Sequence, residues 1–361
     1  MNSKNKIVIA TGGTGGHVFP SISLGNFLTD YYNIEIFTDE RGLKYLDDYK
    51  NLKIRKIISS RVFSKNIIYI FVGVIKVFLS TISSIILLNR SKPKLIVGMG
   101  GYASFSVCLA GYFLKIPIII YENNLVIGRA NKFLLPFVKK ILVSTNSITG
   151  IKKKYNSKVS FTGFLLRNKI FNLKRNITQI NQNNLSILIM GGSQSAKVFG
   201  EEIPEIIKKC HDYGIKFNIY QQCMEVQKSK ISDIYKKLNI NFELFSYTDD
   251  ISTYYKKSDL AITRCGASSL SELVNLNIPF IAIPLPSSMD NHQLKNAKYF
   301  QNEGFCFLLE QKYLLEKLFD MLKSVQENKN ILPLFKEKMI KHSDKEALYF
   351  AKKIIKETIN G

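Results

Sequence analysis

Two successive series of short apolar runs, each followed by a longer amphipathic stretch, constrain the fold of this chain more than any other feature. The first series is Ile7–Thr11, Ile34–Phe37, Ile54–Ile58, Leu95–Val97, Ile118–Tyr121, Ile141–Val143 and Val159–Thr162. The second is Leu185–Met190, Phe217–Tyr220, Phe242–Phe245, Leu260–Thr263, Pro279–Ile283 and Phe305–Leu309. Such runs are typical of strands buried on both faces, and their alternation with helices is typical of doubly wound parallel sheets. The pattern predicts an α/β chain of two Rossmann-like domains, with ligands in a cleft outside the carboxyl ends of the strands.

The segment Asn168–Asn184 separates the two series and is rich in Asn, Lys and Gln, which is a linker composition. A chain of 361 residues is also long enough for two domains. We therefore expect an N-terminal domain over residues 1–163 and a C-terminal domain over residues 164–342. The remaining residues, 343–361, are expected to pack on either domain, including back on the first.

A helix is predicted for the end of the chain. Ser343-x-x-Glu346 matches a capping box. The apolar residues that follow form one helical stripe, namely Ala347, Phe350, Ala351 and Ile354.

Composition limits the class of protein. The chain is 46% hydrophobic and 22% charged, which excludes a disordered or collagen-like protein. Its net charge of +23 would attract nucleic acid, an anionic membrane or a phosphorylated substrate, and charge alone does not choose among them. The five cysteines lie far apart without a C-x-x-C pair, as expected in a reducing cytosol. The first apolar run is too short for a signal peptide, so we expect no export.

A glycine loop, Gly12–Gly16, follows the first predicted strand, and His17 comes at its end. Such a loop presents backbone N–H groups at a helix N-terminus, where phosphate or developing negative charge is favoured. Pro20 suits the first turn of that helix. His17 can accept a proton near neutral pH, although a capping or packing histidine is the alternative.

A dinucleotide-binding oxidoreductase is a competing interpretation of this loop. Asp39 ends the second predicted strand, where a ribose-binding acid would lie. However, a G-x-G-x-x-G pattern counted from Gly13 places Val18 at the third glycine, so the spacing departs from the fingerprint.

Two further loops of the first half follow predicted strands. Gly98–Ser104 contains a second glycine run and precedes a helix predicted over Phe105–Leu114, so its N–H groups would open toward the same cleft. Tyr121–Asn124 places consecutive polar groups at another strand end, where ordinary loop decoration is the alternative.

The second half repeats this arrangement. Gly191–Ser195 forms a second phosphate cradle, and Arg264–Glu272 leads from a strand into a helix that should end near Asn277. Glu272 could accept hydrogen bonds from the paired hydroxyls of a ribose, although Ser269-x-x-Glu272 is also a capping box. The polar loop Pro284–Gln293 offers donors and acceptors for a sugar.

Several catalytic motifs do not occur in the sequence. There is no D-x-D pair, no His, Cys and carboxylate set at metal-ligand spacing, no P-loop and no Gly-x-Ser-x-Gly. We therefore expect neither a metal nor a cofactor.

The stretch Ile67–Leu88 is apolar apart from Lys76 and is long enough to span a bilayer of ~30 Å. A stripe of small or polar residues distinguishes one of its faces: Tyr69, Gly73, Lys76, Ser80, Ser83 and Ser84. A span would also put the two glycine loops of the first half on opposite sides of the membrane. We expect a helix partly packed on the sheet and partly dipped into an anionic membrane interface, with a buried core helix as the alternative.

Six motifs in this order resemble the MurG family of peptidoglycan N-acetylglucosaminyltransferases over nearly the whole chain. They are GGTGGHVFP (Gly12–Pro20), GMGGYAS (Gly98–Ser104), YENN (Tyr121–Asn124), GGSQSA (Gly191–Ala196), RCGASSLSE (Arg264–Glu272) and PLPSSMDNHQ (Pro284–Gln293). The resemblance implies a GT-B fold, with the acceptor and membrane side on the N-terminal domain and the nucleotide sugar mainly on the C-terminal domain. It implies an inverting, metal-independent glycosyltransferase, peripheral at the cytoplasmic face of the cell membrane. The reaction would transfer GlcNAc from UDP-GlcNAc to the 4-hydroxyl of undecaprenyl-pyrophosphoryl-MurNAc-pentapeptide, converting lipid I to lipid II in peptidoglycan synthesis.

The resemblance also implies roles for individual residues. His17 would be the catalytic base or an acceptor contact, Glu272 would bind the ribose, and Thr248 would lie where backbone groups hold the uracil. The implied donor-site positions are Thr14, Gly15, Gly16, Asn124, Arg167, Ser193, Thr248, Ala267, Ser268, Ser269, Leu270, Ser271, Glu272 and Gln293. The loops that would bind the acceptor pyrophosphate contain Gly13, Gly100, Gly101 and Tyr102.

The sequence departs from the family pattern in four places. The residues before Arg167 are Phe-Leu-Leu rather than Asn-Pro, YENN replaces HEQN, Ser195 replaces a frequent glycine and His292 replaces a common Gln. Three alternatives remain open: a related GT-B enzyme with another lipid acceptor such as diacylglycerol, an NAD-binding oxidoreductase, and a basic nucleic-acid-binding protein. No nucleic-acid recognition module is visible, so we expect no nucleic acid partner.

Overall fold

The computed structural model describes residues 4–46, 49, 51–59, 67–173, 184–192, 196–246, 248 and 250–361, with the side chains of 67–71 and 196 excepted. The chain forms two compact units, which are described separately. The first unit comprises Met1–Arg167 together with Asp344–Gly361, and the second comprises Asn168–Ser343. This division falls a few residues after the expected boundary because the backbone N–H of Phe164 donates to Asp344 (3.0 Å) and that of Leu165 to the Tyr121 hydroxyl (3.2 Å).

In the part of the chain that the structure describes, the first unit contains a seven-stranded parallel sheet in the order β3-β2-β1-β4-β5-β6-β7. The strands are β1 (Lys6–Ala10), β2 (Asn33–Thr38), β3 (Lys53–Lys56), β4 (Leu95–Gly98), β5 (Ile118–Glu122), β6 (Lys140–Val143) and β7 (Val159–Phe161). Every run predicted as a strand in the first half is confirmed. The strand order reverses between β1 and β4, the position at which doubly wound sheets bind their ligands.

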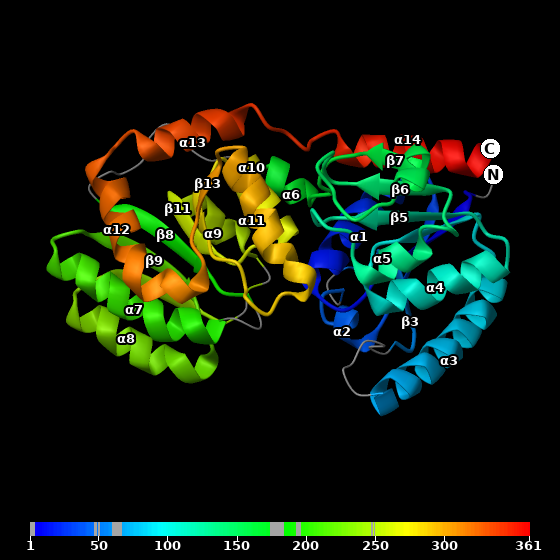
Figure 1. Cartoon of the computed structure of the whole chain (residues 1–361), viewed down its shortest axis with the longest axis horizontal. Helices are drawn as coiled ribbons and strands as arrows, with labels where there is room; N and C mark the ends of the chain where they lie inside the picture. Colours follow the sequence, from blue (N-terminus) through cyan, green and yellow to red (C-terminus); the bar gives the residue numbers. More distant parts are fainter. Residues whose placement is uncertain are drawn as a thin grey trace. The chain divides into compact units, whose positions relative to one another are not determined.

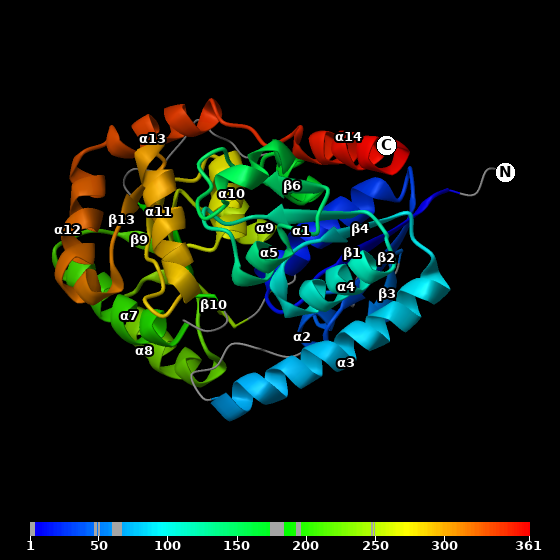
Figure 2. The same ribbon diagram turned by 45° about the vertical axis from the view of Figure 1, so that its right-hand side comes forward.

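Helices cover both faces of this sheet (Figures 1 and 2). The longer helices are α1 (Gly15–Leu28), α3 (Ile67–Ser91), α4 (Gly101–Phe113) and α14 (Ala347–Asn360), and the shorter ones are α2 (Glu40–Leu43), α5 (Arg129–Leu134) and η1 (Lys153–Lys158). Helices α1 and α14 pack with Ile7 and Ile9 of β1 in one apolar core. Helices α3, α4 and α5 pack with Val8 on the opposite face, as the alternation of side chains along a strand requires.

Helix α14 belongs to the first unit but begins later than predicted. Its N-cap is Glu346, so the predicted capping box at Ser343 is wrong. The residues before the helix serve another purpose, since Asp344 accepts the hydrogen bond from Phe164. The buried face contains Ala347, Leu348, Ala351 and Ile355, whereas Phe350, predicted for this face, is 49% exposed.

Two other helix starts also differ from expectation. Helix α4 begins at Gly101 rather than Phe105, because Gly100 and Gly101 adopt φ values of +92° and +81° that turn the chain directly from β4 into the helix. Helix α1 begins at Gly15, so Pro20 lies inside the helix rather than in its first turn. Its ring then replaces an N–H that would have bonded to the carbonyl of Gly16.

The second unit contains, among its described residues, a six-stranded parallel sheet in the order β10-β9-β8-β11-β12-β13. Its strands are β8 (Leu185–Met190), β9 (Phe217–Gln222), β10 (Asn241–Phe245), β11 (Leu260–Thr263), β12 (Phe280–Ala282) and β13 (Cys306–Leu308). The six strands predicted for the second half are therefore confirmed. The order reverses between β8 and β11, which places the loops after these two strands at the switch point.

The helices of the second unit complete a three-layer arrangement. The elements are α6 (Asn168–Phe171), α7 (Ala196–Asp212), η2 (Glu225–Gln227), α8 (Lys228–Lys237), α9 (Ser252–Lys257), α10 (Ala267–Asn275), η3 (Met289–Asn291), α11 (His292–Asn302), η4 (Gln311–Tyr313), α12 (Leu314–Glu327) and α13 (Ile331–Ile340). Helices α7, α8 and α12 share one core with β8, β9 and β11. On the other face, Phe300 of α11 packs edge-on against Phe280 of β12.

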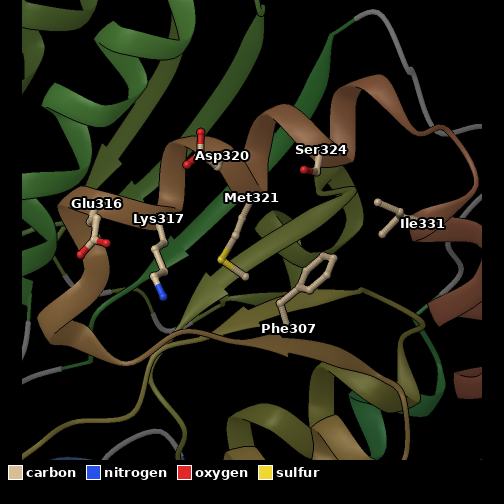
Figure 3. A pocket seen from close by; sticks show the side chains of 7 residues that line it. All are labelled: Phe307, Glu316, Lys317, Asp320, Met321, Ser324 and Ile331. Atoms are coloured by element: carbon tan, nitrogen blue, oxygen red, sulfur yellow. The ribbon is translucent and has the colours of Figure 1, made fainter.

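A hollow of about 410 Å³ lies against the edge strand of the second sheet. Lys317 and Met321 extend from α12 toward β13, where Phe307 lies, and Ile331 of α13 closes one end (Figure 3). Strand β13 is separated from β11 by β12, so this hollow lies apart from the loops at the switch point.

Candidate active site

The two glycine loops of the first unit meet at His17. They follow β1 and β4, which are neighbours at the switch point. A methyl group added at Gly100 would lie 2.8 Å from Nδ1 and Cε1 of His17, and one added at Gly101 would lie 2.8 Å from the carbonyl oxygen of Gly12. The half-buried imidazole therefore packs directly on a backbone that has no room for a side chain. The predicted convergence of these loops is seen within this unit.

Asp39 holds the first glycine loop in place. Its Oδ1 accepts hydrogen bonds from the backbone N–H groups of Gly13 and Gly42, both at 3.0 Å. Its Oδ2 accepts from Arg41 (2.7 Å) and from the Ser59 hydroxyl (2.6 Å). The carboxylate that a dinucleotide fold would offer to a ribose is thus buried and committed to the protein, which argues against the oxidoreductase alternative.

The charge of Asp39 is stabilised by these contacts. Burial alone would raise the pKa of this carboxyl group, but the hydrogen bonds from Ser59, Gly13 and Arg41, together with the charge of Arg41, hold the pKa below its ordinary value of 3.8. The group that supports the loop is therefore ionised at neutral pH.

Glu122 organises the polar loop after β5. Its Oε1 accepts from the backbone and side-chain N–H groups of Asn124, at 3.0 and 3.1 Å. Its Oε2 accepts from the backbone of Gly128 (2.8 Å) and the side chain of Asn131 (2.9 Å). Within the run Tyr121–Asn124, a carboxylate that is 1% exposed thus fixes the orientation of Asn124, whose contact with a donor stays a prediction.

Arg167 and Tyr102 lie near the helices that follow the two glycine loops of the first unit. The guanidinium of Arg167 stacks over the ring of Phe19, 4.9 Å from its centroid, which ties it to the second turn of α1. Tyr102 is the second residue of α4 and is half-buried. Thr14 is the N-cap of α1, and Gly15 and Gly16 open the helix.

In the second unit, the loop after β11 leads into α10. Gly266 is the N-cap, so Ser269 is the third residue of the helix and the capping-box interpretation of Ser269 and Glu272 is wrong. The helix ends at Asn275, slightly before the predicted Asn277. Glu272 instead accepts a hydrogen bond from the hydroxyl of Tyr255 at 2.9 Å, and it is 6% exposed.

The predicted donor positions on α10 differ in accessibility. Ala267 is buried, and Leu270 and Ser271 are 0% exposed. The hydroxyl of Ser271 donates to the carbonyls of Ala267 and Ser268. The half-buried side chains of Ser268 and Ser269 are therefore better placed for a ligand than those of Leu270 and Ser271.

Gln293 joins two loops of the second unit. Its Oε1 accepts from the backbone N–H groups of Cys265 (3.1 Å) and Leu285 (3.0 Å). With both lone pairs of that oxygen engaged, the Nε2 amide is the part of this side chain that could contact a sugar.

Arg264 is buried beneath the same loops. Its guanidinium donates to the carbonyls of Ile283 and Pro284 and to the side chain of Gln311, and it stacks on Phe199. Burial lowers its pKa to about 10, so the group remains charged at neutral pH. The sequence alone gives no sign of this role of Arg264.

The other predicted donor positions of the second unit lie after β8 and β10. Ser193 lies outside the described residues, as do its two neighbours on the C-terminal side. The preceding Gly192 adopts a φ of +67° and donates its N–H to Oε1 of Gln222 at 2.9 Å. The hydroxyl of Thr248 accepts from the backbone N–H of Asp250.

Family models match both units of the chain. The glycosyltransferase family 28 N-terminal domain matches residues 7–143, and the family 28 C-terminal domain matches residues 186–357. Two relatives carry the name UDP-N-acetylglucosamine--N-acetylmuramyl-(pentapeptide) pyrophosphoryl-undecaprenol N-acetylglucosamine transferase. The protein of Pelagibacter ubique (strain HTCC1062) is 38% identical, with 90% of both chains covered. That of Rickettsia canadensis (strain McKiel) is 37% identical, with 98% of this chain and 99% of the relative covered.

The chain belongs to the MurG branch of glycosyltransferase family 28. The crystal structure of MurG from Acinetobacter baumannii shares the fold with a TM-score of 0.77, at 23% identity over 98% of this chain and 99% of that one. Both parallel-sheet units are thus those of a GT-B glycosyltransferase, as expected from the motifs.

The buried groups that hold the loops of this MurG-family chain are harder to find in the sequence than the loops themselves. The sequence indicates Asp39 only as the ribose-binding acid of the competing dinucleotide interpretation, and it gives no sign of the roles of Gln222 and Tyr255. The available signal was a polar residue at the carboxyl end of a strand, but the sequence does not say whether such a residue faces a ligand or a neighbouring loop. Within the described ranges, no group of three His, Cys, Asp or Glu side chains could hold a metal ion. That the reaction needs no metal stays a prediction.

Proposed function

We propose that this chain transfers GlcNAc from UDP-GlcNAc to the 4-hydroxyl of the muramoyl group of undecaprenyl-pyrophosphoryl-MurNAc-pentapeptide, which converts lipid I to lipid II. Relatives at 37% and 38% identity are named for this transfer. The observation that carries the proposal is the position of His17, seated on Gly100 where the two glycine loops of the first unit meet.

The proposed chemistry is a single displacement. The acceptor hydroxyl loses its proton to His17 as its oxygen attacks C1 of GlcNAc from the side opposite UDP. The bond between C1 and the β-phosphate oxygen breaks, and its electron pair leaves with UDP, so the configuration at C1 inverts. Backbone N–H groups at helix N-termini stabilise the negative charge that develops on the leaving group.

Donor contacts are proposed for both units from the family motifs. In the first unit they are Thr14, Gly15, Gly16, Asn124 and Arg167, with Gly13, Gly100, Gly101 and Tyr102 near the acceptor pyrophosphate. In the second unit they are Ser193, Thr248, Ala267, Ser268, Ser269, Leu270, Ser271, Glu272 and Gln293. Glu272 has the best-supported role, because a nearly buried carboxylate beside the hydroxyl of Tyr255 suits the paired hydroxyls of a ribose.

The decisive experiment incubates the purified protein with radiolabelled UDP-GlcNAc and a short-chain lipid I analogue in the presence of EDTA. We expect labelled disaccharide lipid, which would establish the donor, the acceptor and metal independence together. Diacylglycerol, NAD(H) and duplex DNA serve as controls for the three alternatives. Binding of UDP-GlcNAc without product from lipid I would refute the proposed acceptor, and a folded sample that does not bind UDP-GlcNAc would refute the proposed donor.

We further propose that the first unit binds the cytoplasmic face of an anionic membrane through α3. The exposed face of this helix is apolar: Val72, Val74, Ile75, Phe78, Leu79, Ile82 and Ile86 are 40–64% exposed. The small polar residues Ser80, Thr81 and Ser84 point into the unit instead. This is the reverse of an ordinary surface helix of a globular protein, and it suits a helix that lies in a membrane interface.

The position of α3 in the fold bears on how it would meet a membrane. Among the described helices, its segment Val72–Ser91 is long and apolar enough to cross a bilayer, with a mean hydropathy of 1.9 and 28% of that window buried. However, α3 connects β3 and β4, which belong to one sheet, and it lies alongside α4 (Figures 1 and 2). An interfacial position keeps both helix ends on the side of the sheet, whereas a span would separate them. Lys76 and Arg90 are exposed on the same helix and can meet anionic headgroups.

A further inference from the structure

Gln222 is the last residue of β9 and hydrogen-bonds to the loops that follow both neighbouring strands. Its Oε1 accepts the N–H of Gly192 after β8 (2.9 Å), and its Nε2 donates to the carbonyl of Ser246 after β10 (3.2 Å). One side chain thus links the two loops and fixes the distance between them. Among the described residues, no other side-chain hydrogen bond joins these loops directly.

The hydrogen bond to Gly192 restrains the backbone conformation of that glycine. Gly192 has a φ of +67°, and a methyl group added there would find no heavy atom of the described residues within 4 Å. Packing by the described residues therefore does not hold this glycine in its left-handed conformation. The Gln222 acceptor orients the peptide between Gly191 and Gly192, at the start of the loop that precedes α7.

The bond to Ser246 extends the connection. The hydroxyl of Ser246 donates to Glu225 of η2 at 2.6 Å, and Lys228 lies 2.9 Å from the same carboxylate oxygen. A continuous polar chain therefore runs from the loop after β8, through the end of β9, to the loop after β10 and into η2. Thr248 lies two residues beyond Ser246.

We propose that Gln222 is a positioning residue for the nucleotide part of the donor, because it sets the spacing between the loop that leads to Ser193 and the loop that carries Thr248. The inference rests on the proposed function, in which the first loop receives the diphosphate and the second the uracil. Gln222 itself need not touch the donor. Its effect is to present both loops in the spacing that one nucleoside diphosphate requires.

The neighbouring Gln221 provides a matched control. Successive side chains of a strand point to opposite faces, and Gln221 is 0% exposed on the other face. Its Oε1 accepts from the Tyr235 hydroxyl at 2.6 Å, and its Nε2 donates to the Phe199 carbonyl at 3.3 Å. Gln221 joins α7 and α8 to the sheet but no donor loop, so its replacement tests the effect of a general loss of stability.

The experiment compares the wild type with Gln222→Met and Gln221→Met, which keep side-chain length but remove the amide. For Gln222→Met we expect the KM for UDP-GlcNAc to rise about tenfold, the equivalent of one or two lost hydrogen bonds, with kcat and the acceptor KM unchanged. Hydrogen exchange should become faster in the peptide that contains Gly192. Gln221→Met should lower the melting temperature without raising the donor KM.

Several outcomes would overturn the inference. An unchanged donor KM in Gln222→Met would do so, as would a parallel rise in the acceptor KM or an equal rise in Gln221→Met. If the wild type itself neither binds nor uses UDP-GlcNAc, the proposed function fails and the donor role of Gln222 fails with it. The exchange rate of the Gly192 peptide would still show in that case whether Gln222 holds the loop, so the two failures are distinguishable.

Discussion

His17 shows how one side chain depends on the backbone beneath it. The imidazole rests on Gly100, and any side chain at that position would displace it. The glycine run after β4 is therefore as necessary for the position of the proposed base as the histidine itself.

We expect His17→Ala to lower kcat by about 100-fold or more, because general base catalysis commonly contributes that much. Binding of UDP to the variant should stay close to that of the wild type, since the proposed role concerns the acceptor hydroxyl. Turnover with the lipid I analogue and calorimetric titration with UDP measure the two quantities. A loss of UDP affinity as large as the loss of turnover would contradict the role of base.

The lowered pKa of Asp39 should make the free energy of unfolding depend on pH. Its folded pKa lies below the ordinary value of 3.8, so its contribution is complete above that value and is lost as the pH falls through the folded pKa. Asp39→Asn should therefore lower the free energy of unfolding at pH 7, and the difference from the wild type should shrink as the pH approaches 3. Denaturant unfolding of both proteins across this range checks the prediction. A difference that stays constant would mean that the charge of Asp39 contributes nothing.

At the scale of the element, α10 combines a helix start with a carboxylate one turn further on. Glu272→Ala should weaken UDP-GlcNAc binding by about 10- to 100-fold, because hydrogen bonds to a charged group are worth more than neutral ones. Asn275→Ala is the control on the same helix, since Asn275 is its last residue and no donor contact is proposed there. Equal donor affinity in Glu272→Ala and the wild type would remove the ribose role.

A change on the exposed face of α3 should weaken membrane binding without altering catalysis. Phe78 is 64% exposed, and Phe78→Asp should lower partitioning into phosphatidylglycerol vesicles by about tenfold or more through the lost burial of an aromatic side chain. Turnover of a water-soluble acceptor analogue should not change. Leu334→Asp, at a 57% exposed position on α13 of the second unit, is the matched control. Equal partitioning of the Phe78 and Leu334 variants would place the membrane surface elsewhere.

Strands and glycine loops could be predicted from the sequence because their signals are local. A buried β-branched run such as that of β1 and a glycine with positive φ such as Gly100 follow from short-range sterics. The start of α14 could not be predicted in the same way, because Asp344 bonds to Phe164, far away in sequence. Similarly, Asp39 sits where either a ribose or a loop could take its hydrogen bonds, and the tertiary structure alone decides between them.

At the scale of the whole molecule, the two units should respond separately to changes in their cores. Ile355 of α14 is 0% exposed in the core of the first unit, so Ile355→Ala should cost about 2–5 kcal/mol there. Hydrogen exchange should become faster in the peptides of β1, β2 and β4 and stay unchanged in those of β8, β9 and β11. Ile340→Ala, at a position that is 59% exposed at the end of α13, should alter neither set. Faster exchange in both units of Ile355→Ala would mean that they unfold as one.

Because the end of the chain returns to the first unit, the second unit is completely synthesised before the first. Strands β1 to β7 emerge first, but the core beside α1 lacks Leu348, Ala351 and Ile355 until the entire second unit has been translated. At about 5–20 residues per second, that delay lasts roughly ten to thirty-five seconds. The second unit, although encoded later, has all of its own residues before the first does. A nascent chain therefore carries an uncovered apolar face of α1 through much of its synthesis, and this is the stage at which a chaperone would protect it.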